Sequence, residues 1–467
     1  MSNDARPVPS SPPEAWEPFV RFARLVGRPL ERFLRIEAAS GILLLVAATV
    51  ALVWANSPWA VSYAELWHTS LGLRIGPFHF ERTLEWFVND VLMVVFFFVV
   101  GMEIRREIHE GELSQWRRAA LPVAAALGGM LAPAAIYLLI AGAPATRSGW
   151  GVPMATDIAF AVGILALLGR RVPAALRVLL LALAIIDDLG AIVVIALFYS
   201  SGVETAGLLL AGSGLLALFA LQRLGIRARS VYIVPGLVVW AGIYAANVHP
   251  TIAGVVIGFA TPVRAWLGRD GFLCGVEREI GRLRSASSPP SPHQLAGILR
   301  NVNLARREAV SPADALIEVL HPWVAFGIMP LFALANAGVS VAGGSLDAES
   351  RSVVAAVGAG LVLGKPAGVL LATWLTLRVG VASLPVGIGL PHLIVLGVVA
   401  GVGFTMALFV AQLAFEDAHL LAAAKIGVLA ASVAAGLLGL IAGRLLLPPV
   451  ASGAARTADE AERSTEL

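Results

Sequence analysis

The stretch LLLALAIIDDLGAIVVIALFY, residues 179–199, is an apolar run that contains two adjacent carboxylates, Asp187 and Asp188. A run of about 20 mainly apolar residues is long enough to cross a bilayer as a helix. A charge at mid-membrane costs about 2.5–3.5 kcal/mol on insertion scales, so such groups persist when they pair, line a water-filled cavity or take part in chemistry. The stretch therefore predicts a membrane helix that carries a functional site.

Two other apolar runs also carry charged residues. Asp157 lies in GVPMATDIAFAVGILALL, residues 151–168, and Lys365 lies in AAVGAGLVLGKPAGVLLATW, residues 355–374. An ion pair with Lys365 would neutralise one of the three aspartates and leave the other two unexplained. We therefore predict an ion or proton site near the middle of the membrane, and not only a structural salt bridge.

The residue types at this site indicate the kind of ion. Asp187 and Asp188 are neighbours on one helix, so their side chains point about 100° apart, and one can hold an ion while the other faces a partner. Carboxylates, a threonine hydroxyl and free backbone carbonyls are hard oxygen ligands that suit small, hard cations. No His or Cys accompanies them, which argues against zinc or copper. A carboxylate that can hold either a proton or a cation is already an exchange site.

The composition of the chain is that of a polytopic membrane protein. Of its 467 residues, 58% are hydrophobic and 14% are charged, whereas soluble domains have about 45–50% apolar and about 25% charged residues. The single cysteine, Cys274, excludes an intrachain disulfide. Twelve apolar runs are candidate membrane helices, and we expect an all-α protein with twelve transmembrane helices: 38–57, 84–102, 119–142, 149–168, 174–199, 205–222, 230–246, 250–263, 316–339, 352–376, 392–413 and 422–446.

The arginines predict the orientation of these helices. Almost all of them fall on one side of the expected membrane, which is the side of both termini, and this bias places both termini in the cytoplasm. The pI of about 9.3 follows from this topology and does not indicate nucleic-acid binding. No cleavable signal peptide is predicted. We expect a cytoplasmic N-terminal extension (1–36), a twelve-helix membrane domain (37–446) and a cytoplasmic tail (447–467).

Two of the expected helices are interrupted. The fourth contains Thr156 and Asp157 after Gly151 and Pro153. The eleventh contains a run of helix-weakening residues near its middle. Interrupted helices in corresponding positions of two halves indicate a transporter site between inverted repeats, here segments 3–5 and 10–12. Unwound backbone is tolerated in a membrane only where it lines a cavity. The run in the eleventh helix comprises Gly401, Gly403 and Thr405.

Two segments between the apolar runs have their own patterns. Residues 71–82, LGLRIGPFHFER, alternate around a Gly-Pro pair and are read either as a short β-hairpin on the outer face or as an ordinary loop. Residues 264–313 form a long, Arg-rich cytoplasmic loop with SASSPPSP at its centre. We expect this loop to be flexible and partly helical at its ends.

Titratable residues also lie near the ends of the apolar runs. Glu103, Arg106 and Glu107 follow the second run at spacings that place them on one helix face. They form either a solvated salt-bridge cluster or a regulatory site. His249 lies at the outer end of the eighth run, and histidine titrates in the physiological range. Its role is either structural or a response to pH.

Several stretches resemble, in the same order, those of the NhaA-type sodium/proton antiporters. The resemblance covers roughly residues 36 to 446. Besides the two aspartate runs it includes VGMEIRREIHEGEL, NVHPTIAGVVIGF, VLHPWVAFGIMPLFALANAGV, VLGKPAG and GVGFTMALFVAQLAF. The N-terminal extension and the 264–313 loop depart from the shorter members of the family.

The resemblance implies roles for the charged residues. Asp188 matches the essential cation ligand, and Asp187 matches the aspartate that pairs with Lys365, so the two aspartates would bind Na⁺. Thr156 and Asp157 match the unwound part of the fourth helix, where Asp157 compensates helix-end dipoles and the two interrupted helices cross near mid-membrane. The cytoplasmic residues Glu103, Arg106 and Glu107, together with His249, match residues linked to the pH response.

The family also implies the activity, the partners, a transporter role for the 37–446 domain and a location in a bacterial inner membrane. We expect secondary exchange of Na⁺ or Li⁺ for H⁺, pH-regulated and electrogenic, that serves sodium and pH homeostasis, with no enzymatic activity and no cofactor. A homodimer would form through the 71–82 hairpin. Two other classes are open to a chain with intramembrane carboxylates. An intramembrane aspartyl protease needs one aspartate on each of two helices, which adjacent residues cannot supply, and a passive cation channel needs a filter sequence that is absent from this chain.

Overall fold

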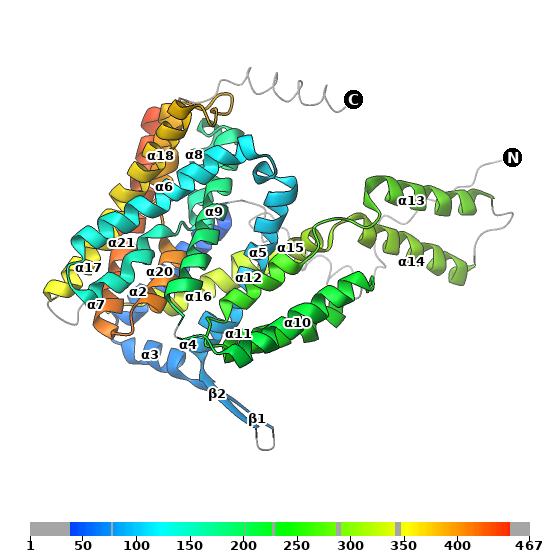
Figure 1. Ribbon diagram of the computed structural model, residues 1–467, viewed down its shortest axis with the longest axis horizontal. Helices are drawn as coiled ribbons and strands as arrows, with labels where there is room; N and C mark the ends of the chain where they lie inside the picture. The colour runs from blue at the N-terminus through cyan, green and yellow to red at the C-terminus, as the bar shows by residue number, and fades with distance from the viewer. Residues whose placement is uncertain are drawn as a thin grey trace, which may run out of the picture.

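The structure is a computed structural model that describes residues 38–75, 78–200, 202–226, 229–285, 291–340 and 347–448. The described chain is a helical bundle with one small β-hairpin at its edge (Figure 1). Seven helices are long and apolar enough to cross a membrane, and the number rises to ten if each of three bent helix pairs is one span. Each of the twelve predicted apolar runs is largely helical, but two of these helices are short, so the count of twelve spans stays a prediction.

The part of the chain up to the fifth predicted run contains both strands. Its elements in chain order are α2 (Ala38–Ala55), α3 (Ala60–His68), β1 (Ser70–Ile75), β2 (Phe78–Thr83), α4 (Leu84–Trp86), η2 (Phe87–Leu92), α5 (Met93–Glu110), η3 (Glu112–Ser114), α6 (Trp116–Ile140), α7 (Pro144–Arg147), η4 (Ser148–Met154), α8 (Ile158–Leu168), η5 (Gly169–Arg171) and α9 (Ala174–Phe198).

The described remainder is entirely helical apart from its connections. Its elements are α10 (Thr205–Arg223), η6 (Arg229–Tyr232), α11 (Ile233–Ala245), α12 (Thr251–Ala260), α13 (Gly268–Ser285), α14 (Pro292–Ala309), α15 (Pro312–Trp323), η7 (Val324–Ile328), α16 (Met329–Asn336), α17 (Ala348–Ala359), η8 (Gly360–Gly364), α18 (Lys365–Val379), α19 (Leu390–Ala400), α20 (Phe404–Ala414) and α21 (Ala418–Leu446).

The two predicted interruptions are present. The η4–α8 pair bends by 47° at residues 155–157, and the α19–α20 pair bends by 45° at residues 401–403. Glycine is needed at the second break because a Cβ on Gly401 would lie 2.5 Å from the carbonyl oxygen of Leu361. The sequence therefore predicted both breaks correctly.

The helix that begins with Lys365 is packed tightly against α6. A Cβ on Gly368 would lie 2.0 Å from the carbonyl oxygen of Gly128, and one on Gly128 would lie 2.2 Å from the carbonyl oxygen of Gly368. The two backbones therefore touch directly. Since Lys365 lies one turn before Gly368, this contact fixes the depth at which the lysine enters the bundle.

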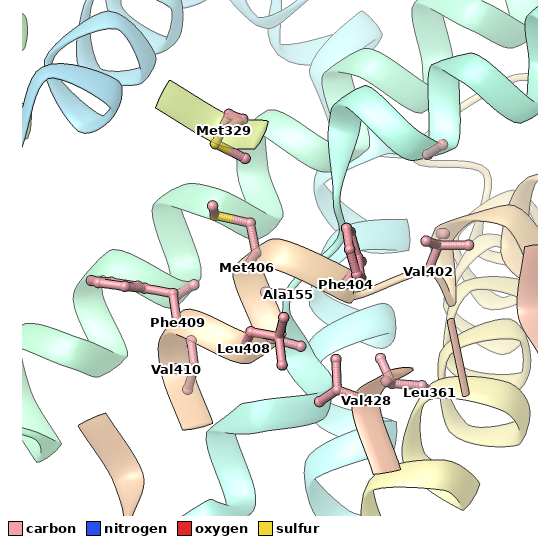
Figure 2. Close-up of a cluster of buried hydrophobic side chains, with 14 of the residues drawn as sticks. Ala155, Met329, Leu361, Val402, Phe404, Met406, Leu408, Phe409, Val410 and Val428 are labelled. Atoms are coloured by element: carbon pink, nitrogen blue, oxygen red, sulfur yellow. The ribbon is translucent and has the colours of Figure 1, made fainter. Parts of the chain in front are cut away.

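The largest apolar core of the described chain surrounds the interrupted helices. Figure 2 shows the side chains of α20 packed between those of neighbouring helices. Because apolar side chains surround this region, water and counter-ions have little access to any charge within it. The labelled residues are Ala155, Met329, Leu361, Val402, Phe404, Met406, Leu408, Phe409, Val410 and Val428.

The predicted hairpin at residues 71–82 is confirmed in its two strands. β1 and β2 pair antiparallel from Ser70 opposite Thr83 to Ile75 opposite Phe78, while the two residues of the turn lie outside the described chain. The guanidinium of Arg82 donates a 2.8 Å hydrogen bond to the hydroxyl of Tyr244 on α11. The hairpin is thereby attached to the helix bundle at its base.

The 264–313 segment differs from the prediction of a flexible loop. It contains α13 and α14, two helices of 18 residues each, and only 286–290 lie outside the described chain. The second helix begins with a capping box, in which Ser291 and Gln294 each accept a hydrogen bond from the other's backbone N–H. The expectation of helix at the ends of the segment is confirmed, but the helices extend over most of it, because the start signal of α14 follows directly after the SASSPPSP run. The extension 1–36 and nearly all of the tail 447–467 fall outside the described residues.

Candidate functional site

Asp187 and Asp188 lie in the middle of α9 and are both fully enclosed. The ammonium of Lys365 is 2.8 Å from Oδ2 of Asp187, and neither side chain is exposed to solvent. The hydroxyl of Thr156 lies 2.7 Å from the same oxygen, to which it can donate a hydrogen bond. The predicted pairing of Lys365 with Asp187 is therefore observed. Of the two adjacent aspartates, Asp187 is the one that contacts side chains of other helices.

Lys365 connects three parts of the bundle. It is the first residue of α18 and follows η8, a π-helical segment, so the helix changes its winding immediately before the lysine. Its ammonium also donates a hydrogen bond to the carbonyl oxygen of Met154, at the end of η4. That carbonyl is available because the helix is interrupted there and has no intrahelical donor for it. One cation thus holds η4 and α9 to α18.

Asp157 caps two helices with one carboxylate. Its Oδ1 accepts a 3.0 Å hydrogen bond from the backbone N–H of Phe160 in the first turn of α8. Its Oδ2 accepts hydrogen bonds from the backbone N–H of Thr405, at 3.1 Å, and from the hydroxyl of Thr405, in the first turn of α20. A helix N-terminus carries a partial positive charge, so this carboxylate compensates two dipoles at once.

The two interruptions are bonded to each other. The N–H of Asp157 donates to the carbonyl oxygen of Val402 over 2.8 Å, and the hydroxyl of Thr156 lies 3.0 Å from the carbonyl oxygen of Ala400. Gly403 permits this approach, because a Cβ there would lie 3.2 Å from the carbonyl oxygen of Ala155. The breaks therefore form one unit next to the aspartates of α9.

Asp188 differs from the other two aspartates. Neither of its carboxylate oxygens has a hydrogen-bond partner among the described residues, and Oδ1 of Asp187 also has none. Asp188 interacts electrostatically with Asp187, Asp157, Lys365 and Glu103. Three aspartates and one lysine carry a net negative charge when all are ionised. Buried polar atoms without partners are rare in proteins, and these three oxygens could hold a proton or a small cation.

Two of the three residues at the end of α5 have partners outside this group, and Arg106 also acts electrostatically on Glu103. Arg106 pairs with Asp314 on α15 over 3.6 Å, and Glu107 accepts a 2.7 Å hydrogen bond from the N–H of Glu112. Within the described chain no ion pair joins Arg106 to Glu103 or Glu107. The sequence spacing could not reveal this arrangement, because α15 offers a closer partner from another part of the chain.

His249 lies in the turn before α12 and away from the three central aspartates. Its Nε2 is 3.8 Å from Oδ1 of Asp90, and its Nδ1 is 2.8 Å from the hydroxyl of Thr251. Its ring meets the ring of Phe409 on α20 edge to face, with 5.4 Å between the centroids. The structure thus connects His249 with α20 through Phe409, a contact that no sequence pattern indicated.

Sequence reasoning missed a second polar group beside α20. Asn336 donates a 2.8 Å hydrogen bond to Asn89 and accepts one from Gln412, and Asn89 is next to Asp90. All four residues lie inside apolar runs. The rule that identified Asp187 would therefore have found Asp90 as well, had it been applied to the second run.

The fold and this site define a polytopic membrane protein with buried carboxylates at the meeting point of two interrupted helices. A family model described as Na⁺/H⁺ antiporter 1 matches residues 31–442. The Na(+)/H(+) antiporter NhaA 2 of Myxococcus xanthus strain DK1622 is 64% identical to the chain over the full length of both proteins. The chain belongs to this family of Na⁺/H⁺ antiporters, which are transporters and not enzymes.

Other relatives agree. The Na(+)/H(+) antiporter NhaA 2 of Sorangium cellulosum strain So ce56 is 55% identical over 98% of both chains. The protein of the same name from Pseudomonas putida strain KT2440 is 51% identical, over 88% of this chain and 91% of its own length. The resemblance that the motifs carried is confirmed, and with it Na⁺/H⁺ antiport by a multi-pass bacterial membrane protein.

Proposed function

We propose that Asp188 is the residue at which Na⁺, or Li⁺, and H⁺ compete, with Asp187 as a second ligand. The observation that carries this proposal is the pair of buried Asp188 oxygens with no hydrogen-bond partner in the described chain, within the field of four other charged groups. Since one carboxylate cannot hold both ions at once, alternate exposure of this site to the two sides of the membrane exchanges them. Carboxylate oxygens suit both small alkali cations.

The exchange is electrogenic in this proposal. Asp187 and Lys365 form a neutral pair at 2.8 Å, and Asp157 is held by the first turns of two helices. A cation that binds between Asp187 and Asp188 displaces the proton of Asp188 and takes over the charge of Asp187, so the ammonium of Lys365 loses its partner and gives up a proton. Two protons, one from Asp188 and one from Lys365, are then released for each cation, so charge moves across the membrane.

The remaining expectations belong to the same proposal. The protein is proposed to have twelve spans with inverted repeats in the inner membrane, with both termini in the cytoplasm because the arginines gather on that side, and to form a homodimer through the β1–β2 hairpin. Glu103, Arg106, Glu107 and His249 are proposed to adjust activity to pH. Of these four, Glu103 acts electrostatically on Asp188, more weakly than Asp187, Asp157 and Lys365 do.

The test of the proposal is Na⁺-induced proton release from proteoliposomes that contain the purified protein, scanned over pH. Exchange requires that a Na⁺ gradient drives proton movement against a proton gradient. A passive cation channel would let each ion run only down its own gradient. Repeating the measurement with Li⁺ in place of Na⁺ tests which cations are exchanged. Clamping the membrane potential at two values tests separately whether the exchange is electrogenic.

A further inference from the structure

The helices α13 and α14 form a hairpin that projects from the bundle beyond α15 and packs mainly on itself (Figure 1). The two helices are antiparallel. At one end the N–H of Leu267 donates to the carbonyl oxygen of Glu308 over 3.0 Å, and nearer the middle Asn301 donates to Glu279 over 3.2 Å. The hairpin is joined to α12 and α15 by short connections, so it must lie close to the ends of these apolar helices.

Each helix has one buried residue that marks the side facing its partner, Glu279 on α13 and Ala305 on α14. A helix turns by about 100° per residue. Arg269 lies ten positions before Glu279, Leu273 lies six before it, and Ile280 lies one after it. These offsets turn the three side chains about 80°, 120° and 100°, respectively, from the facing side. These three residues therefore share one flank of α13.

The same offsets recur on α14. Leu295 lies ten positions before Ala305, Leu299 lies six before it, and Arg306 lies one after it. The three side chains are therefore turned from the facing side by the same angles and in the same sense as those on α13. Because the helices run antiparallel, the same sense of rotation on both helices leads to the same side of the hairpin. The two flanks therefore form one continuous surface.

We call this surface the basic–apolar face. Its apolar members are exposed although they are large: Leu273 by 46%, Ile280 by 42%, Leu295 by 42% and Leu299 by 59%. Its arginines lie on both helices and are exposed as well. Arg284 lies five positions after Glu279, about 140° from the facing side, and so borders the same flank. The complete set is Arg269, Leu273, Ile280 and Arg284 on α13, with Leu295, Leu299 and Arg306 on α14.

We propose that the basic–apolar face lies on the surface of the bilayer and binds anionic phospholipids. Leucine and isoleucine flanked by arginines are the composition of helices that lie in the membrane interface, where the apolar side chains enter the acyl boundary and the cations meet phosphate groups. The hairpin is held next to a membrane by α12 and by the α15–α16 span, so it need not lose translational freedom to bind. The face carries three arginines and none of its seven members is acidic, which favours an anionic surface over a neutral one.

The test uses the full-length protein in nanodiscs of phosphatidylcholine alone or with phosphatidylglycerol. A nitroxide is attached either to the native Cys274, which is exposed and lies on the opposite flank of α13, or to Leu273→Cys in a Cys274→Ser background. The two positions are adjacent in sequence but differ in direction by about 100°. In anionic nanodiscs the label at 273 becomes accessible to oxygen and protected from a water-soluble nickel chelate, while the label at 274 stays in water.

The charge variants have a matched control. Substituting Arg269→Gln, Arg284→Gln and Arg306→Gln together lowers the ratio of membrane-bound to free hairpin about a hundredfold, which corresponds to about 1 kcal/mol for each arginine. The control triple Arg278→Gln, Arg300→Gln and Arg307→Gln removes the same charge from the opposite side and keeps the label at 273 protected. If both triples lose protection equally, the face has no special role and the proposal fails.

Two results would overturn the proposal without any charge variant. One is a label at 273 that remains in water in anionic nanodiscs. The other is a label at 273 that is protected from the nickel chelate equally well in neutral and in anionic nanodiscs and that shows dipolar broadening from a second label. This result would show that a second copy of the chain covers the face. Raising the salt concentration on the labelled protein must weaken the protection in anionic nanodiscs, because exposed charges are screened within about 3 Å at 1 M salt.

Discussion

Asp157 and Thr405 are 248 residues apart in sequence and are joined by two hydrogen bonds, one from the backbone N–H of Thr405 and one from its hydroxyl. This contact connects the break before α8 with the start of α20. A negative charge between two helix N-termini stabilises both helices. It also occupies Asp157 with protein donors, which leaves Asp188 as the aspartate with free oxygens.

The first prediction concerns this contact. Thr405→Val removes the hydroxyl donor and keeps the shape of the side chain, so the protein should lose about 1.5–3 kcal/mol, the range for a hydrogen bond to a charged group. Thr405→Ser keeps the hydroxyl and should lose much less. Thermal unfolding of both variants in detergent measures the difference. Equal melting temperatures for the two variants would mean that the hydroxyl contributes nothing.

The second prediction concerns Asp188. Asp188→Asn should abolish sodium/proton exchange while the protein remains folded in the membrane, because an amide keeps the shape but neither releases a proton nor supplies a full charge. The control is Asp270→Asn on the exposed surface of α13, which should exchange normally. Proton release from proteoliposomes gives the measurement, and substantial exchange by purified Asp188→Asn would disprove the assignment.

The third prediction is the dependence on pH. As pH falls, protons occupy Asp188 and exclude the cation, so exchange should decrease steeply on acidification and recover when the Na⁺ concentration is raised. The apparent affinity for Na⁺, measured as the half-saturating concentration, should weaken by up to tenfold for each pH unit where one proton competes. A half-saturating concentration that stays constant from acid to alkaline pH contradicts competition at one carboxylate.

The fourth prediction concerns the buried ion pair. Lys365→Ala leaves Asp187 buried without its cation and should cost about 3–5 kcal/mol. Adding Asp187→Asn removes the orphaned charge and should restore part of that loss, so the double variant should melt above Lys365→Ala alone. Strictly additive losses would show that the two groups are not coupled in the folded protein. Exchange by the double variant is a separate readout, since it distinguishes a pair used only for stability from a lysine that carries a proton.

The fifth prediction concerns the contact that positions Lys365. Gly368→Ala places a methyl group against the backbone of Gly128, so α18 must shift, and overpacking of this kind costs about 1–3 kcal/mol. Gly358→Ala on α17 has open space around the new methyl group and should be neutral or stabilising. The Gly368→Ala protein should therefore melt at a lower temperature than the Gly358→Ala protein. A Gly368→Ala protein as stable as Gly358→Ala would mean that α6 and α18 are not in close contact.

The sequence alone was sufficient for the local features of this protein. Apolar runs of spanning length, charges inside them and Gly-rich breaks are local patterns, because insertion into a bilayer depends on the composition of each segment. Asp187, Asp188 and Lys365 were identified in this way, as were the interruptions near Asp157 and Gly401. Helix at the ends of the 264–313 segment was expected, but its extent was not, because the start signals of α14 are short and follow directly after a polar, Pro-rich run.

The tertiary structure decided which charge meets which partner. Asp187 and Asp188 are equivalent in sequence, and only the position of α18 gives Lys365 to the first and leaves the second without a donor. Asp314 takes Arg106 for the same reason, since α15 packs beside α5. Burial and hydrogen bonding depend on which helices pack together, and that packing brings residues hundreds of positions apart within 3 Å, a relation that no local pattern in the sequence encodes.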